Sequence, residues 1–442
     1  MTGQAYGNVG TRICVVGLGY VGLPTAVAFH EAGFGVTGVD VSKKTVASIA
    51  NGNNPLIDGS SNLEIPTGVD SWRVTDDFTE AIPNSDVILI TVPTPVKADN
   101  SPDLSYVESA STSVVKNLDR SKNTVVVLES TVYPGVTRRI LGGICEDHGI
   151  EQGSQVTLAY CPERVNPGDA NRGIESVAQI VGCDNKEIGE ELSVMFGNIT
   201  KESSTYVGKI EVAEASKLIE NVQRDIDIAL SNELAMVLPK MGIDVEDVLT
   251  AAATKWNFHR HSPGIGVGGH CIPVDPYFYI SMAEEMGFPS MLSTSARKLN
   301  NSMPENCARD ILQITQKIEH PRILILGYSY KAEVGDIRET PVKYMAEYLT
   351  NHGGEVIIWD PFVEAEEYPQ DITVVDSPYS VEEIDIVVLA TGHDQIINMD
   401  WERIATQFSE NPHIYDGRRV LVKSLFENSG WIFDGIGVPR KN

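Results

Sequence analysis

The sequence predicts an α/β protein with two parallel-sheet domains joined by a helical segment. Short apolar strands alternate with helical patterns over the first half of the chain, which is typical of a doubly wound sheet. One long helical pattern then runs over 209–241, and the alternation of strand and helix returns after residue 320. We therefore expect three domains, over 1–207, 208–319 and 320–442.

The first expected strand, 12–16, leads into Gly17-Leu18-Gly19-Tyr20-Val21-Gly22 and an apolar helical segment. Such a strand, turn and helix present N–H groups and a helix N-terminus to a pyrophosphate. The next strand, 35–39, ends in Asp40, whose carboxylate can accept hydrogen bonds from a ribose and repel a 2′-phosphate. This predicts a Rossmann domain that binds NAD rather than NADP, although Lys43 and Lys44 lie nearby. The alternative is a glycine turn that binds nothing.

Further strands are expected at 86–92, 124–129 and 155–159, and ligands of such sheets bind beyond the carboxyl ends of the strands. Three segments fall there: Pro93-Thr94-Pro95, Ser130-Thr131 and 162–168. Each alone could be a plain turn. We interpret 51–70 as a mobile loop on the same side. The expected cofactor-binding residues are Gly17, Gly19, Tyr20, Val21, Gly22, Asp40, Lys44, Thr94 and Thr131.

Composition excludes several classes of function. With 34 basic and 61 acidic residues among 442, the net charge is −27, which argues against binding to nucleic acid or an anionic membrane. Adaptation to high salt is an alternative reason for the excess acid. The six cysteines show neither a Cys-x-x-Cys pair nor the spacing of a metal site, so we expect no metal and a cytoplasmic protein. No signal-peptide core and no apolar run of about 20 residues is present.

The glycine-rich stretch 266–269 precedes Cys271, which lies four residues before Asp275 and just ahead of a helix expected at 276–286. Glycines leave N–H groups able to face a ligand, and a thiol beside such donors can act as a nucleophile. The alternative is an inert buried cysteine. Lys217 and Asn221 share one face of the long helix, where a plain solvated lysine is the alternative. Two more helices are expected at 245–253 and 293–318.

The last domain begins with a strand at 322–327, followed by Gly327-Tyr328-Ser329-Tyr330-Lys331. This turn lacks the second and third glycines of the first one, so a second dinucleotide site is not expected. Lys331 and Arg338 would suit a nucleotide diphosphate. Strands at 355–359 and 385–390 complete a smaller α/β domain that ends near residue 442.

Together these motifs resemble the UDP-glucose/GDP-mannose dehydrogenase family, from about residue 12 to 419. The resemblance rests on Gly17-x-Gly19-Tyr-Val-Gly22, Val92-Pro-Thr94-Pro, Glu129-Ser-Thr131-Val, Pro162-Glu163-Arg164-Val, Glu214-x-x-Lys217-x-x-x-Asn221, Gly268-Gly-His270-Cys271-x-x-x-Asp275 and Lys331-x-x-x-x-Asp336-x-Arg338. It implies an NAD-binding Rossmann domain, a central helical domain that forms a homodimer, and a C-terminal Rossmann-like domain that holds UDP.

The resemblance also implies a four-electron oxidation at the sugar 6-position by two NAD molecules in succession. Cys271 would form a thiohemiacetal and then a thioester, with Lys217 and Asn221 holding the oxygen. Asp275 and Glu163 would transfer protons or position water, and Thr131 would lie nearby. The implied substrate-binding residues are Glu163, Arg164, Val165, Asn166, Lys217, Asn221, Arg260, Gly268, His270, Lys331 and Arg338.

Departures from the UDP-glucose branch of the family predict the sugar. His270 and Val274 stand where that branch has serine and lysine, which resembles the branch that oxidises UDP-N-acetylhexosamines for polysaccharides and glycans. UDP-N-acetylglucosamine is our first choice, and UDP-N-acetylmannosamine, UDP-N-acetylgalactosamine and UDP-glucose are alternatives. We expect Arg164, Asn166 and His270 to bind the acetamido group, unless Arg164 anchors its loop and His270 packs beside the thiol. A two-electron hydroxyacid-type dehydrogenase and a non-catalytic UDP-sugar-binding protein are the remaining alternatives.

Overall fold

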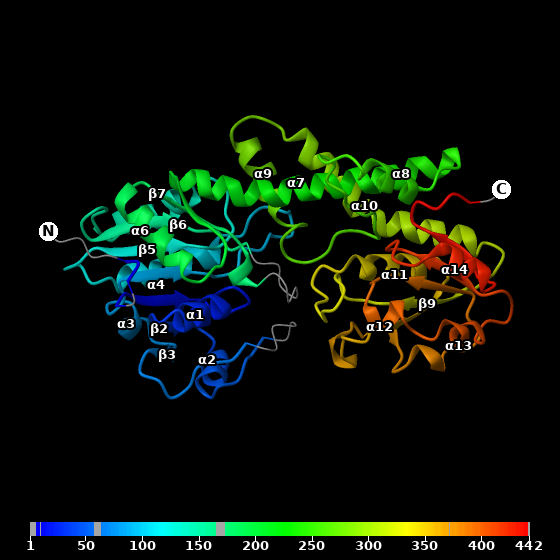
Figure 1. The fold of residues 1–442 in the computed structure, drawn as a ribbon, viewed down its shortest axis with the longest axis horizontal. Coiled ribbons are helices and arrows are strands. Elements are labelled where there is room, and N and C mark those ends of the chain that lie inside the picture. The colour runs from blue at the N-terminus through cyan, green and yellow to red at the C-terminus, as the bar shows by residue number, and fades with distance from the viewer. Residues whose placement is uncertain (1–5, 9, 57–62, 165–172, 371, 441–442) are drawn as a thin grey trace. The chain divides into compact units, whose positions relative to one another are not determined.

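The computed structural model describes residues 6–8, 10–56, 63–164, 173–370 and 372–440. The chain forms two compact units, which are drawn with their elements labelled in Figure 1. Unit 1 comprises Met1–Glu220 and Tyr277–Phe288, and unit 2 comprises Asn221–Pro276 and Pro289–Asn442. Each unit contains one β-sheet. The limits that we predict for three domains stay a prediction.

The sheet of unit 1 has the strand order β3-β2-β1-β4-β5-β6-β7-β8. The strands are β1 (Arg12–Val16), β2 (Gly35–Val39), β3 (Trp72–Thr75), β4 (Val87–Ile90), β5 (Thr124–Leu128), β6 (Val156–Tyr160), β7 (Gln179–Cys183) and β8 (Ser204–Gly208). Strands β4, β5 and β6 are buried throughout, which their near-continuous apolar runs predict for a sheet covered on both faces. Only the pairing of β6 with β7 is antiparallel among the described neighbours.

The helices of unit 1 lie between these strands. They are α1 (Gly22–Glu31), α2 (Lys43–Ala50), α3 (Phe78–Ala81), α4 (Ser105–Lys116), α5 (Gly143–Asp147) and α6 (Lys186–Gly197), with a π-helical turn η1 (Thr137–Gly142) and a short helix η2 (Ile174–Ser176). Local capping sets two of the starts. Ser42 accepts the Thr45 N–H at the beginning of α2, and Asn185 accepts the Ile188 N–H at the beginning of α6, as is usual for these residue types.

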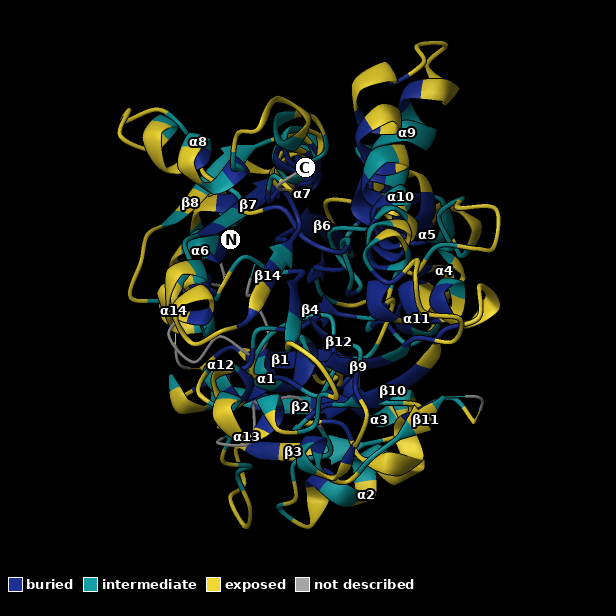
Figure 2. Ribbon diagram, turned by 90° about the vertical axis from the view of Figure 1, so that its right-hand side faces the viewer, coloured by how far each residue is buried: buried dark blue, intermediate teal, exposed yellow. Residues whose placement is uncertain are grey.

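The sheet of unit 2 has the order β11-β10-β9-β12-β13-β14, and its described pairs are parallel. The strands are β9 (Arg322–Leu326), β10 (Glu355–Trp359), β11 (Thr373–Val374), β12 (Ile386–Leu389), β13 (His413–Asp416) and β14 (Ile432–Gly435). This order repeats that of β1 to β6 in unit 1. Figure 2 shows β9 and β12 in the dark blue of buried residues, whereas the helices carry exposed stripes.

The longest helix is α7 (Ile210–Val237), shorter than the 209–241 that we predict. A 3-10 helix η3 (Leu238–Met241) follows and contains Pro239, which lacks the N–H that would continue the α-helical pattern. The other elements are α8 (Val245–Ala252), α9 (Asp275–Glu285), α10 (Met291–Ile314), α11 (Pro341–Asn351), η4 (Ala365–Glu367), η5 (Pro378–Ser380), α12 (Asp394–Ile397), α13 (Trp401–Ala405) and α14 (Lys423–Asn428). Among the described residues, none of the helices has the length and apolarity that a membrane crossing requires.

A buried polar network joins α7 to α10 within unit 2. The Arg297 Nη1 lies 2.6 Å from the Asp225 Oδ1, and Asn300 donates to the same carboxylate at 2.8 Å. Asn232 donates to the Asn300 Oδ1 and accepts the Gly264 N–H, each at 2.9 Å. The network therefore fixes the backbone a few residues ahead of Cys271.

Candidate active site

The fold requires glycine at positions 17 and 22 of the 17–22 turn, whereas the third glycine, Gly19, leaves room for a ligand. Gly17 has a φ of 96°, and a Cβ on Gly22 would lie 1.8 Å from the Gly17 carbonyl oxygen. A Cβ on Gly19, in contrast, would meet no atom within 4 Å. The backbone at Gly19 is thus open to a pyrophosphate at the N-terminal end of α1, as a dinucleotide site requires.

Asp40 follows β2 and holds two backbone groups. Its Oδ2 accepts the Leu18 N–H and its Oδ1 accepts the Ser42 N–H, both at 2.8 Å. The carboxylate remains partly exposed, as do Tyr20, Val21, Thr94 and Thr131, while Lys44 is fully exposed. The open face at Gly19 and the exposed edge of Asp40 therefore fit NAD.

Replacing Asp40 by alanine should weaken NAD binding by roughly 1.5–3 kcal/mol, because a charge-assisted hydrogen bond to the ribose is lost. The preference for NAD over NADP should narrow in the same variant. Calorimetric titration with each cofactor measures both effects. Asp119→Ala is the matched control, since Asp119 also accepts bonds in an exposed turn of unit 1, from Ser121. Equal NAD affinity of the two variants would mean that Asp40 only supports its turn.

A buried carboxylate on α7 holds the loop that carries Thr131. Glu214 accepts the Gly135 N–H at 2.6 Å, and the N–H and hydroxyl of Thr137 at 2.9 and 2.6 Å. Burial raises the pKa of Glu214, and these bonds counteract it. Our sequence reasoning gives Glu214 no role of its own, although an acid three residues before Lys217 is the signal that could have found it.

Lys217 lies one turn further along α7 and is 9% exposed. This burial excludes the solvated lysine that we considered as the alternative. A buried lysine needs an anionic or polar partner, so its position is compatible with a role in holding an oxyanion.

Glu163 and Arg164 follow β6. Glu163 is partly exposed and, together with burial, raises the pKa of Glu129, which follows β5. The Arg164 guanidinium pairs with Glu220, with its Nη2 2.5 Å from the Glu220 Oε1, and donates to the Ala178 carbonyl at 2.8 Å. These bonds favour the alternative in which Arg164 anchors its loop. Val165 and Asn166 lie outside the described residues.

Cys271 differs from the other five cysteines, all of which are described and unbridged. It is partly exposed, whereas Cys14, Cys145, Cys161, Cys183 and Cys307 are buried. Burial raises the pKa of Cys14 and of Cys307 to about 12. The Cys271 carbonyl accepts the N–H of Asp275 at 2.8 Å, so Cys271 forms the turn that begins α9. A helix N-terminus stabilises negative charge and suits a cysteine that reacts as its thiolate.

Two predicted catalytic side chains meet in unit 2. The Asn221 Nδ2 donates to the Asp275 Oδ2, from α7 to the start of α9. Asp275 is 2% exposed, and Asn221 is partly exposed. The bond uses one hydrogen of the Asn221 amide and fixes the direction of the other, so the amide can still donate to a ligand.

The glycines before Cys271 have a different purpose from the one that we expect. A Cβ on Gly268 would lie 2.5 Å from the Tyr330 Cβ, and one on Gly269, whose φ is 86°, would lie 2.7 Å from the Tyr330 ring. The Gly269 N–H donates to the Arg338 carbonyl at 3.1 Å. The Gly269 N–H thus bonds within the protein, and Gly268 and Gly269 serve close packing against Tyr330.

Three basic residues that we predict to bind the substrate, Arg260, Lys331 and Arg338, lie in unit 2. The Arg338 Nη2 is 2.5 Å from the Asp336 Oδ2. Burial acts to raise the pKa of Asp336, but Arg338 and, less strongly, His270 lower it overall. Lys331 is partly exposed, and Arg260 is exposed in an ion pair with Glu246.

Arg418 is a residue that our sequence reasoning missed. It comes directly after the carboxyl end of β13, where its N–H donates to the Asp416 Oδ1 at 2.9 Å. A Cβ on Gly264 would lie 3.0 Å from its Nη1, so the guanidinium sits against the loop that leads to Cys271. Burial lowers the pKa of Arg418, and Asp416 counteracts it. The Asp-Gly-Arg sequence after a strand is the signal that could have found it.

Comparisons with known proteins identify the family of the chain. Three models of the UDP-glucose/GDP-mannose dehydrogenase family match: the NAD binding domain over 11–200, the central domain over 211–302 and the UDP binding domain over 324–423. A UDP-N-acetyl-D-glucosamine 6-dehydrogenase of Pseudomonas aeruginosa is 34% identical over 418 residues, 93% of this chain and 97% of that protein. A UDP-N-acetyl-D-mannosamine dehydrogenase of Pyrococcus horikoshii is 33% identical over 433 residues, 96% and 99% of the two chains.

Solved structures are similar over the same length. A UDP-D-ManNAc dehydrogenase from Pyrococcus horikoshii has a TM-score of 0.84 at 31% identity, covering 97% of this chain and all of its own. These matches confirm the resemblance, the NAD cofactor and the UDP-binding domain that the sequence predicts. The chain therefore belongs to the UDP-glucose/GDP-mannose dehydrogenase family and is an NAD-dependent UDP-sugar dehydrogenase.

Proposed function

We propose that this enzyme oxidises the 6-hydroxyl of a UDP-N-acetylhexosamine to a carboxylate, with UDP-N-acetylglucosamine as the first choice. The observation that carries the chemistry is the position of Cys271, the one partly exposed thiol, in the turn that leads into α9. The sugar is supported by His270 and Val274 beside that thiol and by relatives named for N-acetylglucosamine and N-acetylmannosamine substrates. The product would serve polysaccharide or glycan synthesis in the cytoplasm, where cysteines stay reduced.

The proposed reaction consists of two successive oxidations. NAD, held by the turn at Gly19 and by Asp40, would supply the hydride acceptor for carbon 6 in each of them. A carboxylate, Glu163 or Asp275, takes the hydroxyl proton in the first, which yields the aldehyde. The Cys271 thiolate then bonds to the aldehyde carbon while the aldehyde oxygen takes back the proton that the carboxyl group holds. This covalent capture keeps the aldehyde in place.

The second oxidation converts this thiohemiacetal to a thioester as its hydroxyl proton passes to a carboxylate. Water then adds to the carbonyl carbon, the carbon–sulfur bond breaks and the Cys271 thiolate leaves. Lys217 and the remaining N–H of the Asn221 amide would stabilise the oxygen when it is negatively charged. Asp275 contributes indirectly as well, because it orients that amide.

The substrate test compares kcat/KM for UDP-N-acetylglucosamine, UDP-N-acetylmannosamine, UDP-N-acetylgalactosamine and UDP-glucose, at low and at molar salt. We expect the best N-acetylated sugar to exceed UDP-glucose by at least about 100-fold, because a site built to bond the acetamido group leaves polar groups unpaired without it. Two NADH should form per sugar. One NADH would indicate the two-electron hydroxyacid-type reaction, and none a binding protein. Equal efficiency with UDP-glucose would remove the sugar assignment and leave the family.

We infer that the enzyme is a homodimer that pairs through α7. Four large apolar side chains of this helix are exposed: Val212, Ile219, Leu230 and Val237. Apolar side chains that gather on one exposed helix favour burial against a partner. A second copy of the chain is the occupant that the family resemblance implies.

A further inference from the structure

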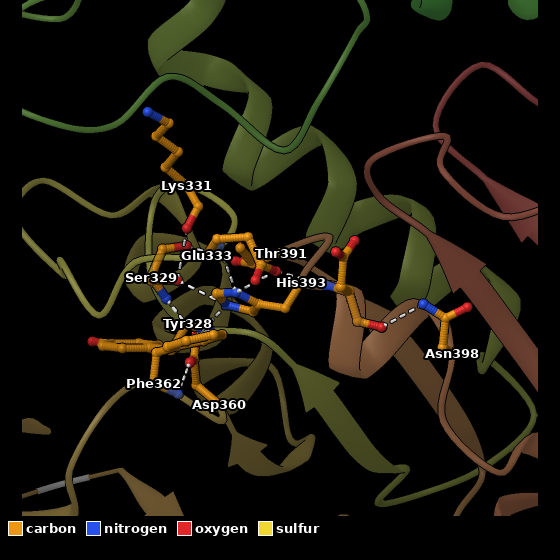
Figure 3. Close-up of polar contacts among 10 residues, drawn as sticks. Tyr328, Ser329, Lys331, Glu333, Asp360, Phe362, Thr391, His393 and Asn398 are labelled. Carbon is orange, nitrogen blue, oxygen red and sulfur yellow. Dashed lines mark hydrogen bonds and ion pairs between the residues drawn. The ribbon is translucent and has the colours of Figure 1, made fainter. Parts of the chain in front are cut away.

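A fully buried histidine lies beneath the turn after β9, in the UDP-binding domain. Figure 3 shows His393 at the centre of polar contacts that reach Ser329, Glu333 and Asp360. Its Nε2 lies 3.1 Å from the Asp360 Oδ2 and 3.0 Å from the Ser329 Oγ. Its Nδ1 accepts the Glu333 N–H at 2.9 Å. The Phe362 ring packs against the imidazole at 4.8 Å between centroids.

The partners of His393 determine its protonation. A backbone N–H can only donate, so the Nδ1 that faces Glu333 must carry a lone pair. The proton of the neutral ring is then on Nε2, shared between Asp360 and Ser329. The Ser329 hydroxyl in turn donates to the Lys331 carbonyl at 3.1 Å. This is no nucleophile–base triad, because serine and aspartate share one ring nitrogen and Ser329 has no base.

The two sides of the imidazole hold the backbone on both sides of Lys331. Its Nε2 contacts the Ser329 hydroxyl, which donates to the Lys331 carbonyl. Its Nδ1 accepts the Glu333 N–H directly. Glu333 has a φ of 62°, a left-handed conformation that costs a non-glycine residue about 1–3 kcal/mol unless its surroundings impose it. Its Oε1 also accepts the Asp394 N–H at 2.7 Å, at the start of α12. In Figure 3 the Lys331 side chain extends away from this cluster.

Comparison with unit 1 shows what His393 adds. Asp360 follows β10, the strand that corresponds to β2, and so corresponds to Asp40. Its Oδ2 accepts the N–H of Tyr328 at 2.6 Å and of Ser329 at 2.9 Å, besides facing His393. The Asp360 side chain has no exposed surface, whereas Asp40 is partly exposed. In unit 2 the Asp360 carboxylate thus binds backbone groups of the protein's own turn. A ligand must therefore be bound by other groups of that turn.

We propose that His393, as its neutral Nε2–H tautomer, is the positioning residue that holds the 329–333 turn and so directs Lys331 toward the diphosphate of the UDP-sugar. Asp360 holds the N-terminal half of the turn and His393 the C-terminal half. The charged groups that face the ring are Asp360 at Nε2 and Glu333, whose Oε1 lies 3.9 Å from Nδ1. The role given to Lys331 rests on the proposed function.

Two substitutions of His393 test the roles of its two ring nitrogens one at a time. Asparagine can place an acceptor where Nδ1 lies, and glutamine places its amide near Nε2 and leaves the Glu333 N–H without its partner. Titration with UDP alone should show a dissociation constant raised about 10-fold in His393→Gln, because that variant loses one hydrogen bond. In His393→Asn the dissociation constant should stay within about 3-fold of wild type. NAD affinity should not change. His413→Gln is the control, since His413 bonds Asp434 at 2.8 Å elsewhere in unit 2.

Two further measurements test the proposal even if both His393 variants fold poorly. Selective ¹⁵N-histidine labelling of the wild-type enzyme should give one buried ring with an unprotonated Nδ1 and a protonated Nε2, and any other protonation state overturns the proposal. Unchanged UDP affinity in His393→Gln, with only thermal stability lost, overturns it too. Lys331→Met tests the underlying assignment, because UDP affinity equal to that of wild type would remove Lys331 from the substrate site whatever His393 does.

Discussion

Replacing Cys271 by serine should reduce sugar oxidation by roughly 1,000-fold or more while NAD affinity stays nearly unchanged. A serine hydroxyl is a poor replacement for a thiolate, so the aldehyde would not be captured. The groups that we assign to NAD, at Gly17, Gly19 and Asp40, lie in unit 1, whereas Cys271 lies in unit 2. Steady-state NADH production and calorimetric titration with NAD measure the two quantities.

Cys145→Ser is the control for this variant, because Cys145 is buried in α5 and burial raises its pKa to about 11. We expect the control to retain activity. Alkylation of the native enzyme with iodoacetamide should modify Cys271 first, since it is the one thiol that is not buried. Normal NADH production by Cys271→Ser would exclude the covalent mechanism.

Replacing Arg297 by methionine should destabilise the enzyme by about 3–5 kcal/mol, because it leaves the Asp225 carboxylate buried without its partner. The two side chains are only 3% and 1% exposed. Burial raises the pKa of Asp225, while Arg297 and Asn300 act against that rise. For a unit of this size the melting temperature of unit 2 should fall on the order of 10 °C, which calorimetry can measure.

The same substitution at Arg309 provides the comparison. Arg309 lies on α10 as well, but its ion pair with Glu305 is exposed, with side chains 63% and 49% accessible. Exposed pairs of this kind contribute little, so Arg309→Met should change stability by less than about 0.5 kcal/mol. Asp225→Asn combined with Arg297→Met should recover part of the loss. Equal melting temperatures for Arg297→Met and Arg309→Met would show that the buried Arg297–Asp225 pair contributes no more to stability than an exposed pair does.

Eight of the fourteen described strands and the long helix could be predicted because their patterns are local. Both the apolar run of β1 and the 3.6-residue period of α7 lie within one window of sequence. The end of α7 was missed because its apolar period continues past Pro239. Strands β3, β7, β8, β11, β13 and β14 were not predicted. Of these, β3 and β8 are largely unburied, β11 has only two residues, and β7 pairs antiparallel with β6, against the parallel pattern of the sheet.

The site could be predicted only where a residue type carries its own chemistry. The thiol of Cys271 and the acid of Asp40 stand out by type and position. Partners far along the chain do not, and they decide what a side chain does. Arg164 bonds Glu220 across 56 residues, and His393 bonds Ser329 across 64. No local motif distinguishes an arginine that anchors a loop from one that binds a sugar.

The packing of Gly268 and Gly269 against Tyr330 has an evolutionary consequence. A side chain at either glycine would collide with Tyr330, so these three positions cannot drift independently. A smaller residue at 330 would relieve the collision but not the strain of a side chain at Gly269, whose φ is 86°. A chimaera that takes the Cys271 loop from one relative and the Tyr330 turn from another would fit only if both parents kept the same pairing. We therefore expect the loop that carries Cys271 and the turn that carries Tyr330 to vary together, although the two segments lie about sixty residues apart in sequence.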